Sequence, residues 1–374
     1  MNRTALARAI GDLCREDGPG AVFRLERLSD GELIHEQAAG RFRADDPRPM
    51  RPGDRFHIAS IAKTMTAALV LDQAGKGAFG PWGLGTTLGD MDLFTGAVLD
   101  ALHRDGGAAI TLDQLLTHTA GIRDAMVDDA TQTGGPAPGS LIGRLMAPGG
   151  DPARPWQPFD PARPFQADAG VLNWYLGTGL GAAALSAPGA AFHYSDTGYV
   201  ILGLALERVT GRPLGHLLRE DLFAPLGMGS SYLAYRDDPP GLDGKRSLES
   251  DPHAGGIPCL SAGVSLSFDW AGGGVVSTAA DLARLARAIA TGNLALRADR
   301  WRQPPGLQPL RHGVAPGLFR WVWPGGLSGW GHAGAWGAKM LVLPDADLIL
   351  AASINDSGRG DDWHSPLLTA LLSA

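Results

Sequence analysis

The sequence contains little cysteine and no concentrated positive charge. Cys14 and Cys259 are the only two cysteines among 374 residues, and neither has a partner at metal-ligand spacing. This argues against a disulfide scaffold and against a zinc site. The net charge is -7 and lysine and arginine form no run, so the chain lacks an electrostatic footprint for nucleic acid or an anionic membrane surface. We expect no metal and neither of these partners.

Long apolar runs are also missing. No segment approaches the roughly 18 apolar residues of a membrane-spanning helix. The N-terminal segment carries a charge every few positions and lacks the apolar core of a secretory signal. With 44% hydrophobic and 19% charged residues, the chain can bury a full core in one large or two interleaved domains. We therefore expect a cytoplasmic protein, and its oligomeric state stays open.

Strands are predicted near both ends of the chain. Residues 21–40 alternate apolar and polar side chains around an Asp-Gly turn, which is typical of a hairpin. Residues 339–343 and 347–353 are strand-like and are separated by a proline. Helical spacing of apolar residues between these ends predicts helices over 61–74, 198–210 and 281–291. The pattern favours an α+β fold in which both termini build one antiparallel sheet flanked by helices.

The middle of the chain has a different texture. Residues 124–191 are rich in proline and glycine, and they include several aromatic side chains. Such a long irregular segment in a compact protein is usually functional, so we expect it to form a lid packed over a site. The predicted division is an α/β domain of residues 1–58 and 198–374, which carries the antiparallel sheet, and a mostly helical inserted domain of residues 59–197.

Chemistry is suggested by residues 56–65 (FHIASIAKTM), where Ser60 and Lys63 stand three apart in an apolar run. On a helix, residues at this spacing share a face with Cβ atoms about 5–6 Å apart. Desolvation lowers the pKa of a lysine, and a neutral amine can then accept a serine proton. No G-x-S-x-G, G-x-G-x-x-G or Walker motif competes with this pair. Alone, the spacing fits a chance pair on a helix as well as a nucleophile with its base.

Two later segments complete a pattern. Residues 188–199 (PGAAFHYSDTGY) lead into an apolar helix, and residues 329–337 (GWGHAGAWG) precede a strand. With S-x-x-K, these segments resemble, in order, the three motifs of penicillin-recognising serine hydrolases. The chain is similar to the class C β-lactamase-like family, which includes esterases, D-aminopeptidases and D-alanyl-D-alanine carboxypeptidases. The resemblance implies a β-lactamase/transpeptidase-like fold.

The resemblance also implies roles for single residues. Ser60 would attack an acyl carbon, while Lys63 and Tyr194 would share the work of general base and acid. The backbone N–H groups of Ser60 and Ala335 would hold the oxyanion. Gly334 would keep the strand edge open to substrate. No cofactor is implied.

Substrate binding is assigned, on the same resemblance, to Asp196, His332, Gly334 and Trp336. Asp196 stands where the family usually has asparagine, and an ionised aspartate accepts hydrogen bonds but cannot donate them. This weakens recognition of an amide, favours a charged Lys63 and shifts the base role toward Tyr194. His332 replaces a lysine that binds a substrate carboxylate, and a histidine is mostly neutral at pH 7; when protonated, it would be a second, weaker cation beside Tyr194.

These features favour a serine hydrolase that cleaves neutral carboxylic esters with an apolar acyl or alcohol group through an acyl-Ser60 intermediate. Three alternatives stay open: a D-amino-acid peptidase, amidase or β-lactamase with the same machinery, an acyltransferase, and a non-catalytic sensor that is acylated once. Their shared prediction is a small-molecule ester or amide substrate.

Overall fold

A seven-stranded sheet forms one side of the protein. The computed structural model describes residues 10–11, 13, 17–237, 249–307, 311–323, 325–360, 363–365 and 367–368. The strands of the sheet, in spatial order, are β2 (Leu33–Ala39), β1 (Ala21–Arg27), β12 (Leu348–Ser353), β11 (Ala338–Leu343), β10 (Ser328–Gly334), β9 (Leu318–Val322) and β8 (Arg311–Ala315). Every neighbouring pair is antiparallel. Because β1 pairs with β12, the sheet joins the two ends of the chain.

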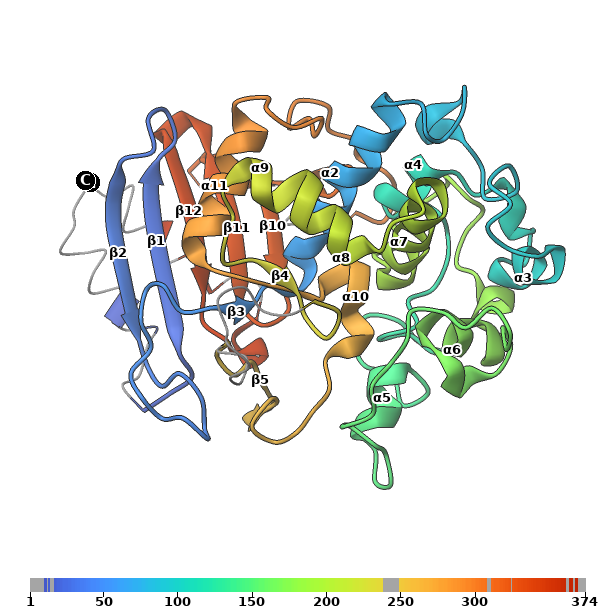
Figure 1. The fold of residues 1–374 in the computed structure, drawn as a ribbon, viewed down its shortest axis with the longest axis horizontal. Helices are drawn as coiled ribbons and strands as arrows, with labels where there is room; N and C mark the ends of the chain where they lie inside the picture. Colours follow the sequence, from blue (N-terminus) through green and yellow to red (C-terminus); the bar gives the residue numbers. More distant parts are fainter. Residues whose placement is uncertain are drawn as a thin grey trace.

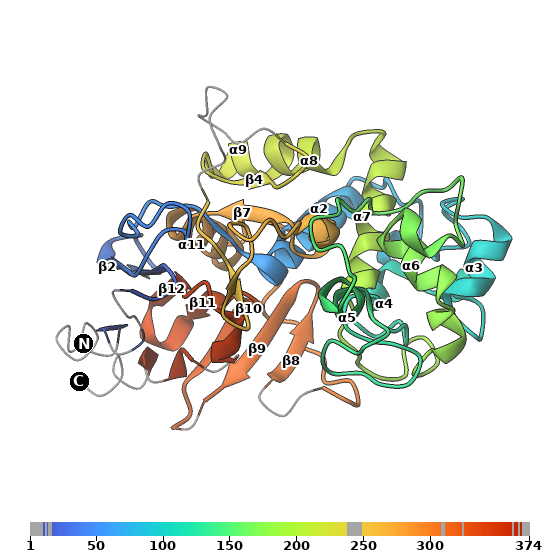
Figure 2. The same ribbon diagram turned by 90° about the horizontal axis from the view of Figure 1, so that it is seen from below.

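Helices make up most of the remaining regular structure. They are α2 (Ala62–Gly75), α3 (Gly96–Leu102), α4 (Leu112–Leu116), α5 (Leu141–Met146), α6 (Val171–Gly177), α7 (Asp196–Thr210), α8 (Leu214–Leu217), α9 (Ala224–Leu226), α10 (Trp270–Gly273) and α11 (Ala279–Ala290). Figures 1 and 2 show the sheet at one end of the molecule and α3 and α6 at the other, with α2 and α10 between them.

Both faces of the sheet are covered. Helix α11 packs on β1, β11 and β12 and buries Leu282, Leu285 and Ile289. Side chains alternate between the two faces of a strand, so Phe23 and Leu350 point to the opposite face, where they form a separate cluster with Trp363 and other apolar residues. This double burial explains why β11 has no exposed residue.

A small three-stranded sheet connects the large sheet to the helices. It consists of β3 (Phe56–His57), β7 (Val275–Ser277) and β4 (Tyr232–Leu233). Strands β5 (His253–Ala254) and β6 (Ile257–Pro258) form a separate two-stranded antiparallel sheet. β3 leads through a 3₁₀ turn, Ala59–Ile61, directly into α2. Helix α2 packs against α7 and α10, so three segments far apart in sequence meet where the S-x-x-K motif lies.

The predicted fold class is confirmed. The hairpin, the two C-terminal strands and the helices at 61–74 and 198–210 all occur, with ends shifted by one or two residues. Ser60 lies in the 3₁₀ turn that precedes α2 and Lys63 in the first turn of α2, so the pair spans the junction between the two. The division into two domains and the lid role of residues 124–191 stay predictions.

Candidate active site

Ser60 is presented by a strained turn. Ile58 N–H donates to Val275 O at 3.1 Å, which ties the end of β3 to β7. The next residue, Ala59, has φ of 46°, a left-handed conformation that costs a non-glycine residue free energy and is found preferentially at functional sites. The turn leaves Ser60 half-buried beside the fully buried Lys63. The local chain path therefore exposes the serine while the lysine stays inside.

Lys63 holds three acceptors together. Its Nζ donates to Ser60 Oγ at 3.1 Å, to Gly272 O at 2.8 Å and to the Asp196 carboxylate. Burial alone would lower the pKa of Lys63, but the Asp196 carboxylate, with Tyr194 adding to it, raises that pKa above its ordinary value. Desolvation alone suggested a neutral amine, whereas Asp196 was expected to favour a charged one. The raised pKa agrees with the second expectation, because the carboxylate keeps the lysine charged.

Tyr194 lies next to this cation with its hydroxyl unsatisfied. Its Oη is buried and has no hydrogen-bond partner among the described residues. Lys63 Nζ lies 5.0 Å from the centre of its ring. Burial raises the pKa of Tyr194 to about 12, although Lys63 and Ser60 oppose that rise. The tyrosine is therefore protonated at neutral pH and close enough to Ser60 and Lys63 to interact with both.

Two residues support the tyrosine ring. His118 stacks on Tyr194 with ring centres 4.3 Å apart, and its Nδ1 accepts the backbone N–H of Ser195 at 3.1 Å. The guanidinium of Arg311 lies 5.6 Å from the centre of the same ring. The sequence patterns assign neither His118 nor Arg311 to the site. For His118 the flanking threonines Thr117 and Thr119 were a possible signal, whereas the sequence of β8, which carries Arg311, has no pattern that points to a site.

The two amides assigned to the oxyanion lie at the meeting point of β10 and the 3₁₀ turn. A Cβ on Gly334 would overlap Ile58 O, so only glycine lets the strand edge come this close to the turn. Neither Ser60 N–H nor Ala335 N–H donates to a backbone carbonyl within the described chain. Both residues border one cavity. This arrangement is compatible with an oxyanion site, and that role stays a prediction.

The cavity beside Ser60 has a volume of about 190 Å³ and mostly apolar walls. Its lining residues are Ser60, Met126, Val127, Ile142, Leu145, Met146, Asp196, Ala254, Ile257, Cys259, Val264, Leu266, Phe268, Asp269, Ala335 and Trp336. Five of them, Met126 to Met146 in that list, belong to the proline-rich and glycine-rich segment. The expected apolar group of a substrate has room here, next to the nucleophile.

His332 and Gly334 are not among the residues that line this cavity. The His332 ring centre lies 6.4 Å from that of Tyr194, and the side chain is buried. Burial and then the Lys63 ammonium lower the pKa of His332 well below its ordinary value. A second cation from His332 is therefore not supported, because the imidazole is neutral.

Sequence reasoning also missed Gly272 as a part of the site. Its carbonyl accepts from Lys63, and a Cβ at this position would lie 2.7 Å from Asp196 Oδ1. Its role could not be predicted, since a backbone carbonyl acceptor leaves no mark on residue type. Asp269, three positions before Gly272, also lines the cavity.

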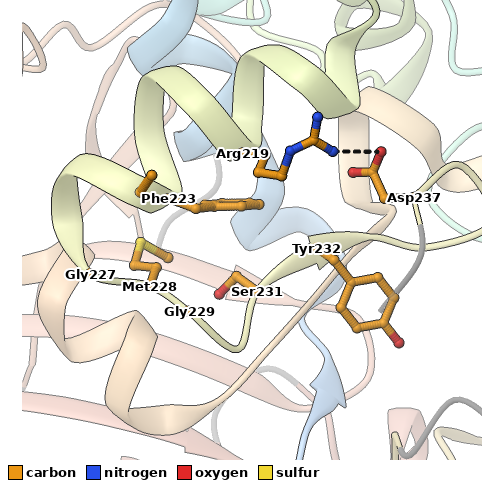
Figure 3. Close-up of a pocket in the computed structure, with 9 residues that line it drawn as sticks. Arg219, Phe223, Gly227, Met228, Gly229, Ser231, Tyr232 and Asp237 are labelled. Carbon is orange, nitrogen blue, oxygen red and sulfur yellow. Dashed lines mark ion pairs between the residues drawn. The ribbon is translucent and has the colours of Figure 1, made fainter. Parts of the chain in front are cut away.

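A second cavity, of about 330 Å³, lies away from these residues (Figure 3). It is formed by the helical stretch Leu218–Phe223 and by the chain from Gly227 to Tyr232. Its lining residues Arg219 and Asp237 form an ion pair at 3.8 Å, drawn as a dashed line in Figure 3. None of the candidate catalytic residues lines it, so the cavity beside Ser60 is the candidate active site.

Within the described ranges, no group of three or more histidine, cysteine, aspartate or glutamate side chains is placed to hold a metal ion. No described helix is both long and apolar enough to cross a membrane.

Comparison with known proteins places the chain. The family model described as Beta-lactamase matches residues 19–372. The chain belongs to the beta-lactamase family. Among curated members of this family, a D-aminopeptidase of Cereibacter sphaeroides is 27% identical over 257 residues, which cover 67% of this chain and 41% of the relative. Esterase EstB of Burkholderia gladioli is 28% identical over 210 residues, 56% of this chain and 45% of the esterase. The chain thus spans under half the length of these two relatives.

The beta-lactamase fold is also found in solved structures that match the whole chain. A D-stereospecific amidohydrolase from Streptomyces sp. superposes with a TM-score of 0.69 at 22% identity, and the match covers 100% of this chain and 99% of that chain. At this identity the likeness establishes the fold. The family resemblance inferred from the three sequence motifs is therefore confirmed.

Proposed function

We propose that this beta-lactamase family member is a serine hydrolase that cleaves carboxylic esters through an acyl-Ser60 intermediate. The observation that carries the proposal is the contact of Ser60 Oγ with the charged Lys63, next to the unsatisfied Tyr194 hydroxyl and at the edge of a largely apolar cavity. A nucleophile, a fixed cation and a proton carrier are the parts that acyl transfer needs.

The first half of the reaction follows from these positions. The ionised form of Tyr194 takes the Ser60 proton as Oγ attacks the acyl carbon, and the carbonyl oxygen becomes an oxyanion held by the Ser60 and Ala335 N–H groups. The Lys63 ammonium stabilises both phenolate and alkoxide, since it lies beside both groups. When the bond to the leaving oxygen breaks, Tyr194 returns its proton to the departing alcohol. Water then attacks the acyl carbon of acyl-Ser60, Tyr194 takes a proton from the water and returns it to Ser60 Oγ, and the acid is released.

The Lys63–Asp196 ion pair favours an ester over an amide. An asparagine at position 196 would donate an N–H to the carbonyl of a substrate amide, whereas the ionised carboxylate only accepts and is already bound to Lys63. Loss of one ordinary hydrogen bond to a substrate carbonyl typically costs about 0.5–1.5 kcal/mol, or about 2- to 10-fold in rate. An alcohol also leaves more readily than an amine, so an ester tolerates the loss better.

A D-amino-acid amidase or peptidase is the second candidate. It is supported by the similarity to a D-aminopeptidase and to a D-stereospecific amidohydrolase. The same Ser60, Lys63 and Tyr194 would serve this reaction, so the two candidates differ only in the leaving group.

A matched ester and amide separate the two candidates. We expect wild type to cleave p-nitrophenyl butyrate with a higher kcat/KM than butyryl p-nitroanilide, measured with Ser60→Ala as the background. Asp196→Asn should raise the ratio of kcat/KM for the p-nitrophenyl ester of N-acetylglycine to that for the butyrate by about 2- to 10-fold, since it restores a donor for an amide carbonyl that the butyrate lacks. Preference of wild type for the anilide, or an unchanged ratio in Asp196→Asn, would show that the ester argument is wrong.

A further inference from the structure

Asp269 puts a carboxylate into the apolar cavity without a protein partner. It is half-buried and lines the cavity together with Ser60. It also occupies the N-cap position of α10, where an aspartate ordinarily accepts a backbone N–H of the helix, yet its side chain makes no such bond. No hydrogen bond or ion pair to this carboxylate occurs among the described residues. The Asp269 carboxylate oxygens are therefore free to accept hydrogen bonds from a ligand in the cavity.

Three other polar side chains of the cavity wall each have a protein contact. Ser60 Oγ and the Asp196 carboxylate both accept from Lys63. Cys259 Sγ lies 3.7 Å from Ile257 O, as a weak donor to it. Among the lining carboxylate and hydroxyl side chains of the described residues, Asp269 is thus the one without a hydrogen bond or ion pair to another protein side chain or backbone group.

Packing fixes the position of this carboxylate. A Cβ on Gly273 would overlap Asp269 Oδ2 and Cγ, so the glycine lets the carboxylate lie flat against α10. Gly272 does the same for Asp196. The two successive glycines place two carboxylates on one side of a short helix, and only one of them has a cation.

An unpaired carboxylate in an apolar setting is costly unless a cation or hydrogen-bond donor joins it. Burial raises the pKa of Asp269 to about 8, with the Asp196 carboxylate adding to the rise and the Lys63 ammonium opposing it. At that pKa the side chain is mostly protonated at neutral pH, and a ligand cation at this place would favour its ionised form. The surrounding walls, which include Leu266 and Phe268, require the rest of such a ligand to be apolar.

We propose that Asp269 is a specificity-determining residue that binds the primary ammonium group of the acyl part of the substrate. The ammonium donates to the Asp269 carboxylate, and an apolar side chain of the same acyl group packs against the cavity walls. This inference rests on the proposed hydrolysis at Ser60 and narrows its substrates to esters of amino acids with apolar side chains. It revises the expectation of a neutral substrate, which considered Asp196 and His332 alone.

The test compares two esters that differ only in the amine. Phenylalanine methyl ester, as each enantiomer, carries the ammonium, whereas methyl 3-phenylpropanoate has the same skeleton without it. For the faster enantiomer, Asp269→Asn is expected to lower kcat/KM by about 10- to 150-fold, the range for loss of a hydrogen bond to a charged group. For the phenylpropanoate, the same variant should stay within about threefold of wild type, which also shows that it folds.

The outcomes that overturn the inference are distinct from those that overturn the proposed function. Asp92→Asn is the matched control, because that side chain is 94% exposed, and it should change neither ester. If the Asp269→Asn variant kept the wild-type kcat/KM for the phenylalanine ester, or lost kcat/KM equally for both esters, the role of Asp269 alone would be overturned. Wild type that cleaves neither ester would overturn the proposed hydrolysis and this inference together.

Discussion

Replacing Lys63 by methionine is expected to lower kcat by about 10²- to 10⁴-fold, the range for loss of a residue that assists proton transfer. The substitution keeps the length of the side chain but removes the cation that contacts Ser60 Oγ. It also leaves the Asp196 carboxylate unpaired, with Gly272 O losing its donor. Breaking a buried ion pair from one side costs about 3–5 kcal/mol, so the free energy of unfolding in urea should fall by about 3 kcal/mol.

A double variant separates the two effects of Lys63. Lys63→Met with Asp196→Asn has no unpaired charge, so it should recover most of the lost stability while kcat stays as low as in the single variant. If Lys63→Met kept kcat within about tenfold of wild type while folded, the lysine would have no part in the chemistry. If the double variant were no more stable than the single one, the ion pair would not be what holds α2 to α7.

Replacing Tyr194 by phenylalanine is expected to separate activity from stability. The change removes the proton carrier, so kcat should fall by about 10²- to 10⁴-fold. The buried hydroxyl has no partner among the described residues, and deleting an unsatisfied polar group costs no hydrogen bond. The free energy of unfolding should therefore stay equal to that of wild type or rise slightly.

Tyr199→Phe is the matched control, because this second tyrosine also lies near Lys63 but donates to Leu116 O at 3.0 Å. It should lose about 1 kcal/mol of stability and keep its kcat. With the pKa of Tyr194 raised to about 12, the phenolate is scarce at neutral pH and becomes commoner as pH increases. The kcat/KM of wild type should thus rise from about pH 7 to about pH 10. A plateau beginning below neutral pH, or a Tyr194→Phe variant with normal kcat, would contradict the role of the tyrosine.

The parts of the fold that could be predicted are those with a local signal. The hairpin over β1 and β2 was visible as alternation around a turn, and α7 as a run of apolar residues. The Ser60–Lys63 contact was predictable from spacing, because the two residues are three positions apart and the contact needs only the local helical geometry. The pairing of β1 with β12 required only the assumption that strands at both ends share a sheet.

The parts that escaped prediction depend on contacts between distant segments. Spacing alone suggested a neutral Lys63, and only the family resemblance brought in Asp196, 133 positions later, whose carboxylate raises the lysine pKa against the effect of burial. The burial that keeps His332 neutral comes from the packing of whole elements. The Gly272 carbonyl and the unpartnered Asp269 acquire meaning only when α10 is placed against α2 and α7. Residue type predicted which groups were present, and tertiary structure determined which of them remained unpaired.

The central claim is that Ser60 is an activated nucleophile, and covalent labelling tests it most directly. Wild type and Ser60→Ala are incubated with a fluorophosphonate, and the intact mass of each is measured. We predict that wild type gains the mass of a single phosphonate, located by peptide mapping on Ser60, and that Ser60→Ala gains none. Wild type that stays unlabelled, or a label that Ser60→Ala acquires equally well, would contradict the account.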